Sequence, residues 1–469
     1  MTSIPITDKL QTLISNLTHS DPPVFYQYQT FIDIPDLLPL SDSLSNEGER
    51  VVYWEAPEEE FSLLGIGQVY AHNTSGKDRF QTSAEIFNRI QERIWTEPET
   101  AISQNIPSLL YFNSFFSNIA PSEWNGFSPS LLLLPRILLS RQNGQTTVSL
   151  NIQIDAGADA ESITTQLTQL LASVHFAEKN TGRKEFSAFP RIGPYLNGEK
   201  SRWNDSVNKS VYSIRHKNID KVVLAKRSEI PVIRTAPLIQ TLDSLRREYP
   251  TCVIFHFREQ NGKSFFGATP EWLARLHDDI LTCDALAGTI ERDPVPERDV
   301  SLGEALHSSE KNRSEHDFVV RYLKKRMQPL ADNIQIPESP SLKKLKNVQH
   351  LYTKMSGVIK PGISPFQVIN QLHPTPAVGG IPSEKAQQFI QQIEQMERGY
   401  YAAPFGWIAL DGDFDMAVGL RSGLMTPETL YLYAGAGIVE GSDPRSEYDE
   451  LQLKLMPLLN VFNSVPVDE

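Results

Sequence analysis

Hydrophobic and polar positions follow two different periods along the chain, and these periods predict a mixture of strands and helices. In the first 200 residues, alternating or apolar runs typical of strands are interrupted by runs with the period of an amphipathic helix. The strand-like runs are "RVVYWEAP", "FSLLGIGQVYA" and "TTVSLNIQID", and the helical runs are "TSAEIFNRIQERIW" and "AESITTQLTQLLASVHFAEK". A polar stretch from Asn180 to Ser201 is a candidate linker, and a helix is predicted to follow it in "WNDSVNKSVYSIRHKNI".

The second half of the chain is denser in strands. The predicted strands are "KVVLAKRSEI", "TCVIFHF", "SFFGATPEWLARL", "DILTCDALAGTI", "YYAAPFGWIAL", "FDMAVGLRSGLM" and "LYLYAGAGIV". Short polar turns such as "REQNGK", "HDD" and "DGDFD" join several of them, which favours antiparallel hairpins. Long helices are predicted at 301–330 and 383–398. Antiparallel strands with separate helices indicate the α+β class.

Composition and charge narrow the possible functions. The 469 residues are 40% hydrophobic and 22% charged, which is ordinary for a globular protein with a large core. A formal net charge of −13 argues against a broad nucleic-acid surface, although a locally basic pocket could still bind an anionic substrate. The start lacks a basic segment followed by an apolar one, and Pro135 and Arg136 interrupt the longest apolar run. We therefore expect a cytoplasmic protein without a membrane span, in which Cys252 and Cys283 are buried thiols.

The end of the patterned region, "AGAGIVEGSDPRSEYDELQLKL", predicts a glycine-rich turn followed by a helix. Ser442 or Asp443 is the candidate N-cap of this helix. Glu447 and Glu450 are three residues apart and share one helix face, and Lys454 follows them. Two interpretations stay open for these letters alone: the acids stabilise a solvated helix start, or they hold something positive.

One predicted strand, "FDMAVGLRSGLM", separates its side chains into two faces. One face is apolar, and the other combines small residues with a single arginine, Arg421. The small neighbours leave room beside a guanidinium, whose planar fork matches a carboxylate. A solvated arginine on a surface strand fits the same letters.

Other candidate residues are weak when taken singly. Lys221 begins a strand and could act as a base if it faces a pocket with cationic neighbours. Glu271 follows a proline turn, and a predicted strand ends at Gly288-Thr289, where N–H groups could meet an anion. Glu315 lies near the opening of a helix. Solvated faces explain most such patterns.

Eight segments carry more information together than singly. In chain order they are "KVVLAKR", "FFGATPEWL", "DALAGT", "SEKNRSEH", "HPTPAVGGIP", "ERGYYAAPFGW", "VGLRSG" and "YAGAGIV…SDPRSEYDE". In this order they resemble the chorismate-utilising enzyme family, which includes anthranilate, aminodeoxychorismate, salicylate and isochorismate synthases. The resemblance covers about residues 205–460 and is faint before 200. It implies two large, mostly antiparallel β-sheets packed face to face, with helices outside. Residues 1–200 would be a variable region of the same α+β body, and 201–469 the chorismate-binding catalytic domain.

The resemblance also implies a metal site and a substrate site. In similar enzymes Mg²⁺ lies between two helix-borne glutamates, which match Glu315 and Glu450, with Glu447 beside the metal. Arg421 and Tyr401 match positions that grip the enolpyruvyl carboxylate of chorismate. The complete set of implied substrate-binding residues is Gly288, Thr289, His350, Ala377, Tyr401, Arg421, Gly435, Gly437 and Lys454.

Three positions select a branch of the family. Lys221 stands where anthranilate-forming relatives carry glutamine, and Ala287 where aminodeoxychorismate-forming relatives carry lysine. Ala377 stands where relatives with lyase activity tend to have threonine. The resemblance therefore implies an isochorismate synthase, in which water attacks C2 of chorismate while the C4 hydroxyl leaves. Lys221 would be the base that activates water, and Glu271 the acid that protonates the leaving group.

Three alternatives stay open at this level, and one of them is a non-catalytic binding module that kept the fold. A salicylate synthase would also eliminate pyruvate, and an anthranilate synthase-type subunit would use ammonia from a glutaminase partner. We expect instead a monomer that needs chorismate and Mg²⁺ and no glutaminase, nucleic acid or membrane. Its product would feed menaquinone or phylloquinone synthesis.

Overall fold

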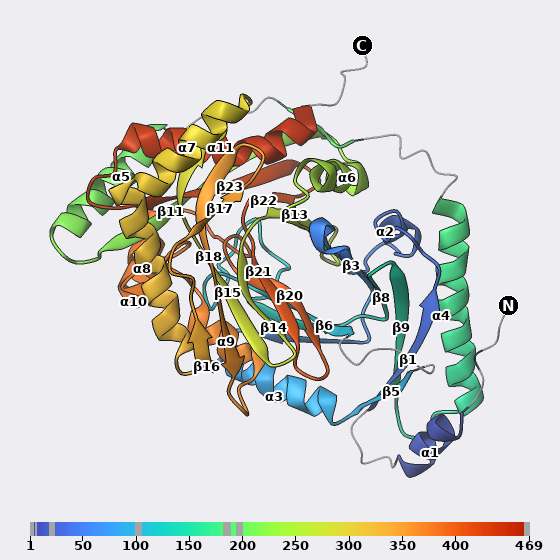
Figure 1. Ribbon diagram of the computed structural model, residues 1–469. Helices are drawn as coiled ribbons and strands as arrows, with labels where there is room; N and C mark the ends of the chain where they lie inside the picture. The colour runs from blue at the N-terminus through green and yellow to red at the C-terminus, as the bar shows by residue number, and fades with distance from the viewer. Residues whose placement is uncertain are drawn as a thin grey trace.

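The computed structural model describes residues 4, 7–17, 24–98, 106–181, 189–193 and 200–463. Within these ranges the strands form two sheets, of 13 and 10 strands, and the helices lie outside them (Figure 1). Apart from β1 and β5, which run parallel, the strand pairs in these ranges are antiparallel. The predicted α+β class and the predicted pair of mostly antiparallel sheets are confirmed.

The larger sheet has the order β10-β11-β23-β22-β13-β12-β2-β3-β8-β9-β1-β5, with β19 beside β11. Its strands are β1 (Val24–Ile32), β2 (Val51–Ala56), β3 (Phe61–Ile66), β5 (Ile94–Pro98), β8 (Ile137–Gln142), β9 (Gln145–Ile154), β10 (Arg191–Ile192), β11 (Lys221–Arg234), β12 (Val253–Arg258), β13 (Ser264–Thr269), β19 (Gly380–Ile381), β22 (Ser422–Met425) and β23 (Thr429–Ile438).

The smaller sheet has the order β16-β18-β15-β14-β21-β20-β6-β7-β4, with β17 beside β18. Its strands are β4 (Tyr70–Thr74), β6 (Pro107–Asn113), β7 (Ser130–Leu134), β14 (Trp272–His277), β15 (Ile280–Glu291), β16 (Ala331–Gln335), β17 (Ser341–Lys344), β18 (Val348–Ile359), β20 (Pro404–Ala409) and β21 (Phe414–Val418).

The helices cover the outer faces of the sheets. In Figure 1, α4 lies beside β9, α8 beside β15 and β18, and α11 over β23. The helices are α1 (Asp8–Asn16), α2 (Leu40–Ser43), α3 (Arg79–Gln91), α4 (Ala160–Thr181), α5 (Lys200–Arg215), α6 (Ile239–Glu248), α7 (Pro296–Ser308), α8 (Glu310–Met327), α9 (Pro365–Leu372), α10 (Ser383–Ile393) and α11 (Pro444–Asn463), with a short 3-10 turn η1 (Pro57–Glu59). None of the helices in the described ranges is long and apolar enough to cross a membrane.

Aromatic side chains fill the space between the two sheets. Phe112 of β6 stacks on Phe257 of β12 with 4.4 Å between ring centroids. Phe255 of β12 meets Phe405 of β20 with 4.5 Å between centroids. All four side chains are buried, and each pair joins one sheet to the other. This aromatic layer holds the sheets face to face, because large rings bury much apolar area and favour specific ring geometries. Both cysteines are also buried free thiols, as predicted.

Strands from before residue 200 pair with strands from after it in both sheets. β2 pairs with β12, and β6 pairs with β20. Most of the candidate linker falls in residues 182–188 and 194–199, which lie outside the described ranges, but Arg191–Ile192 forms β10 against β11. The division of the chain at residue 200 stays a prediction.

Three predicted strands are wrong as continuous elements, because the chain changes sheets within them. One is "FSLLGIGQVYA", which divides into β3 and β4, and the other two cross at neighbouring places. "SFFGATPEWLARL" divides into β13 and β14, and "FDMAVGLRSGLM" divides into β21 and β22. The two crossings lie side by side, since Val418 N–H donates to Glu271 O at 3.0 Å and Ala268 N–H donates to Arg421 O at 3.2 Å. Arg421 adopts a φ of 46°, so the strict two-face alternation predicted for this segment fails there.

The other boundary errors have local causes. The helix predicted at 301–330 is two helices, because Ser309 is extended and its side chain caps α8 by accepting from Asn312 N–H. The helix predicted at 383–398 ends at Ile393, because Glu394 is extended. The strand predicted to end at Gly288-Thr289 continues to Glu291, and Gly288, with a φ of 78°, forms a bulge in the pairing with β18.

Candidate active site

A cavity of about 330 Å³ opens beside the two crossings, between the sheets and helices α8 and α11. All fourteen residues predicted to act in catalysis, substrate binding or metal binding line this one cavity. They are Lys221, Glu271, Gly288, Thr289, Glu315, His350, Ala377, Tyr401, Arg421, Gly435, Gly437, Glu447, Glu450 and Lys454. Their roles stay predictions, but their assembly from segments up to 233 residues apart depends on the tertiary fold.

The opening of α11 explains how its acidic face is presented. Asp443 Oδ1 accepts hydrogen bonds from the N–H groups of Arg445 and Ser446, so Asp443 caps the helix. The side chain of Ser442, the other predicted cap, instead accepts from Val439 N–H. The cap starts α11 at Pro444, and Glu447 and Glu450 face the cavity. That these two acids hold a cation stays a prediction.

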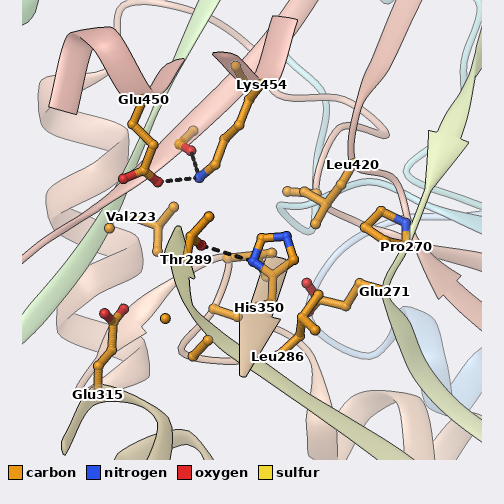
Figure 2. Close-up of a pocket in the computed structure, with 18 of the residues that line it drawn as sticks. Val223, Pro270, Glu271, Leu286, Thr289, Glu315, His350, Leu420, Glu450 and Lys454 are labelled. Carbon is orange, nitrogen blue, oxygen red and sulfur yellow. Dashed lines mark hydrogen bonds and ion pairs between the residues drawn. The ribbon is translucent and has the colours of Figure 1, made fainter. Parts of the chain in front are cut away.

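Two carboxylates that face each other across the cavity are each paired with a lysine. Glu315 of α8 accepts from Lys221 Nζ at 2.7 Å. Glu450 of α11 pairs with Lys454 Nζ at 2.7 Å, and that amine also donates to Gly435 O at 2.8 Å. Figure 2 shows Glu450 and Glu315 on opposite sides of the cavity, with Lys454 turned towards Glu450.

These carboxylates have oxygen donors suited to a hard cation, but they do not form a compact cluster. Across the described ranges, no group of three or more His, Cys, Asp or Glu side chains is gathered closely enough to hold a metal ion. Lys454 lowers the pKa of Glu450, whereas burial raises the pKa of Glu447, and the Glu450 charge adds to that rise. A cation bound beside Glu447 would therefore favour the deprotonated form of this side chain.

The opposite end of the cavity is suited to an anion. Burial lowers the pKa of the Arg421 guanidinium, and no carboxylate in the described part of the chain forms an ion pair with it. His350 Nδ1 lies 2.9 Å from Thr289 Oγ1, and its Nε2 lies 3.5 Å from Arg421 Nη2 (Figure 2 shows the first contact). Burial and the Arg421 charge hold the pKa of His350 well below its usual range, so the imidazole is neutral. Because Arg421 can only donate, His350 Nε2 accepts, and its Nδ1–H faces Thr289.

Glu271 is a buried carboxyl that stays partly protonated near neutrality. It is 6% exposed, and burial raises its pKa from 4.5 to about 7, with a smaller contribution from Asp284. Lys343 Nζ donates to Pro270 O at 2.7 Å, which ties down the peptide preceding Glu271. The geometry therefore provides an acid next to the anion end of the cavity.

Two glycines in β23 make room for the predicted chemistry. A Cβ on Gly435 would lie 2.8 Å from Tyr401 Oη, and a Cβ on Gly437 would lie 3.1 Å from Lys221 Cε. Lys221 is 7% exposed, and its side chain runs along this strand to the cavity. Glycine at these two positions leaves room for Tyr401 and Lys221, because an added Cβ would force either side chain to shift.

Several residues of the cavity wall were not predicted from the sequence. Lys311 and Asn312 of α8 line it, as do Leu286, Leu420 and Tyr433. Lys311 precedes Glu315 by four residues in "SEKNRSEH", and this spacing on a helix predicts a shared face. The apolar residues carried no such signal, because a buried Leu in a cavity wall resembles any core residue.

Comparison with known proteins assigns the family. A family model described as "Chorismate binding enzyme" matches residues 11–463. "Isochorismate synthase MenF" of Bacillus subtilis (strain 168) is 33% identical over 417 residues, which cover 87% of each chain. "Salicylate biosynthesis isochorismate synthase" of Pseudomonas aeruginosa is 32% identical over 452 residues, 95% of this chain and 91% of that one.

Solved structures have the same fold at lower identity. The menaquinone-specific isochorismate synthase MenF from Escherichia coli has a TM-score of 0.77 at 23% identity, covering 96% of this chain and 98% of that one. Anthranilate synthase component I from Streptococcus pneumoniae has a TM-score of 0.68 at 19% identity, covering 85% and 92%. The resemblance inferred from the eight segments is thus confirmed, and the chain belongs to the chorismate binding enzyme family.

Proposed function

We propose that this protein is an isochorismate synthase, which moves the hydroxyl of chorismate from C4 to C2. The observation that carries the proposal is the cavity shared by Lys221 and Glu271, in which burial raises the Glu271 pKa to about 7. A group half protonated near neutral pH can donate a proton and recover it. The names of the two relatives at 33% and 32% identity support the same reaction.

The reaction requires one proton to be taken and one to be given. Water forms a bond to C2 and loses a proton to Lys221, while the ring double bonds shift. This step requires a neutral Lys221 amine, released from its ion pair with Glu315. The C4–O bond breaks, and the leaving hydroxyl takes the Glu271 proton and departs as water. Atoms therefore balance as an isomerisation, and the reverse reaction exchanges the roles of the two residues.

Substrate binding follows from the charge of the cavity. Chorismate carries two carboxylates, and Arg421 provides a guanidinium without a carboxylate partner in the described ranges. Tyr401, stacked on Tyr433 with 5.4 Å between ring centroids, lies on the wall that would meet the enolpyruvyl group. Thr289 and the Gly288 bulge would meet the ring carboxylate. Binding of the two carboxylates would thus hold the chorismate ring between Lys221 and Glu271.

Mg²⁺ is part of the proposal. Glu315 and Glu450, with Glu447 beside them, are the oxygen donors that would hold it, and their chemistry fits this cation. Three carboxylates are not gathered into one cluster in the described ranges, so substrate and water would complete the shell. When bound, the metal neutralises the ring carboxylate and draws electron density from the ring. Calorimetric titration of Mg²⁺ into wild type and Glu450→Gln, without chorismate and again with it, tests these ligands independently of activity.

The deciding experiment incubates the purified protein with chorismate, with and without Mg²⁺ and ammonium, and separates the products by chromatography. Isochorismate alone, dependent on Mg²⁺ and indifferent to ammonium, is the expected result. Salicylate with pyruvate would assign lyase activity, and anthranilate would overturn the interpretation of Lys221 as the base that activates water.

We further propose a cytoplasmic monomer without a glutaminase partner, whose product feeds menaquinone or phylloquinone synthesis. Size-exclusion chromatography and quinone analysis of a deletion strain test these points.

A further inference from the structure

A buried ion pair lies directly behind the cavity without lining it. Arg398, in the loop between α10 and β20, is 0% exposed, and the Glu394 side chain is 3% exposed. The guanidinium donates from Nε and Nη2 to the two carboxylate oxygens at 2.8 and 2.5 Å. The Phe115 ring covers the guanidinium, with 4.2 Å from Cζ to the ring centroid. The fork is therefore fixed in one orientation.

The other contacts of the pair go to backbone atoms of the cavity wall. Arg398 Nη2 donates to Val223 O at 2.8 Å, and Nη1 donates to Val378 O at 2.9 Å. Glu394 Oε1 accepts from Ala225 N–H at 2.6 Å. Val223 and Val378 both line the cavity. The ion pair of Arg398 and Glu394 therefore joins β11, in one wall, to the turn at Val378, in another.

Each joined segment carries a residue of the proposed chemistry. Lys221 lies two residues before Val223 on the same face of β11, and Ala377 directly precedes Val378. A third segment is attached through the backbone, because Tyr401 N–H donates to Arg398 O at 2.9 Å. Arg398 thus connects the strand of Lys221 and the turn of Ala377 through its guanidinium, and Tyr401 through its backbone.

We propose that Arg398, oriented by Glu394, is a positioning residue that sets the place of Lys221 relative to the substrate. The inference rests on the proposed function, since it assigns the effect to the base. A buried ion pair adds little net stability compared with apolar residues of similar volume, so the geometry that the pair enforces is its main contribution. Lysine carries the same charge but lacks the planar fork, and it cannot reach all of these acceptors at once.

Arg398→Lys tests the proposal, and Arg50→Lys is the matched control. Arg50 also forms a buried ion pair, with 2.8 Å from Nη2 to Glu259 Oε1, and neither residue lines the cavity. We expect Arg398→Lys to lower kcat by about 10- to 100-fold, because small misplacement of a catalytic group has effects of this size. KM for chorismate should change by less than about threefold, since Arg421 and Lys454 are retained. Arg50→Lys should lower the melting temperature without changing kcat.

The outcomes distinguish a loss of positioning from a loss of stability and from a failure of the proposed function. A kcat for Arg398→Lys within about twofold of wild type, or a loss equal to that of Arg50→Lys at equal melting temperature, would overturn the proposal. If Arg398→Lys does not fold, Glu394→Gln is the second variant, and unchanged kcat there would overturn it equally. The plot of kcat against pH should keep its shape while kcat falls at every pH, because Lys221 and Glu271 are intact. Wild type that makes no isochorismate would refute the proposed function instead.

Discussion

Replacing Glu271 by glutamine is expected to remove activity and, at neutral to alkaline pH, to stabilise the fold. Burial raises the pKa of this carboxyl from 4.5 to about 7. Between these two pH values the folded protein keeps a proton that the unfolded chain loses. Stability therefore falls as pH rises through this window and stays reduced above it.

The magnitude follows from the two pKa values. They differ by about 2.5 pH units, and each unit corresponds to about 1.36 kcal/mol, so ionising Glu271 costs the folded state about 3 kcal/mol above pH 7. Glutamine has nearly the same shape and no proton to lose. The variant should match wild type below about pH 4.5 and gain on it progressively up to pH 7.

Urea unfolding of both proteins between about pH 5 and pH 9, without chorismate or Mg²⁺, measures this difference. Glu304→Gln, at an exposed position of α7, is the matched control, because it makes the same substitution where the side chain is not buried. A pH-independent difference for Glu271→Gln would refute the raised pKa. Isochorismate formation should fall by at least about 100-fold, and a variant with wild-type activity would remove Glu271 from the mechanism.

Three further substitutions test the other parts of the site. Lys221→Gln should lower isochorismate formation by at least about 100-fold, because the base is lost, and chromatography with ammonium present will reveal any anthranilate. Arg421→Lys should lower kcat/KM by about 30-fold through loss of the planar fork, and steady-state kinetics showing less than a threefold effect would contradict carboxylate binding there. Gly435→Ala places a Cβ 2.8 Å from Tyr401 Oη, and it should raise KM for chorismate by about tenfold. An unchanged KM for that variant would show that Tyr401 does not contact the substrate.

Local patterns were sufficient to predict most elements, because alternation and helical periodicity are properties of neighbouring residues. The strand at Lys221–Arg234 and the capped helix at Pro444–Asn463 both follow from such patterns. The same reasoning failed where the chain changes sheets. Nothing in the alternation of "FDMAVGLRSGLM" indicates that Val418 belongs to one sheet and Ser422 to the other.

The resemblance located the site, although the residue types alone were ambiguous. Glu271 after a proline turn and Lys221 at a strand start are ordinary in any sequence, and only their order among the eight segments singled them out. Lys311 was missed despite its helical spacing from Glu315, because a lysine on a helix is usually solvated. Arg398 lay within a matching segment, but its letters carried no sign that it would be fully buried.

The sequence by itself determined the α+β class, the buried thiols, the N-cap region of α11 and the set of residues available for chemistry. Only the tertiary structure decided that Glu271 and Arg421 would emerge at neighbouring crossings between the sheets. It also decided the raised pKa of Glu271 and the attachment of three cavity segments to Arg398. The physical reason is the distance along the chain over which each interaction acts. Periodicity and capping act between residues a few positions apart, whereas burial, desolvation and electrostatic coupling depend on segments that only packing brings together.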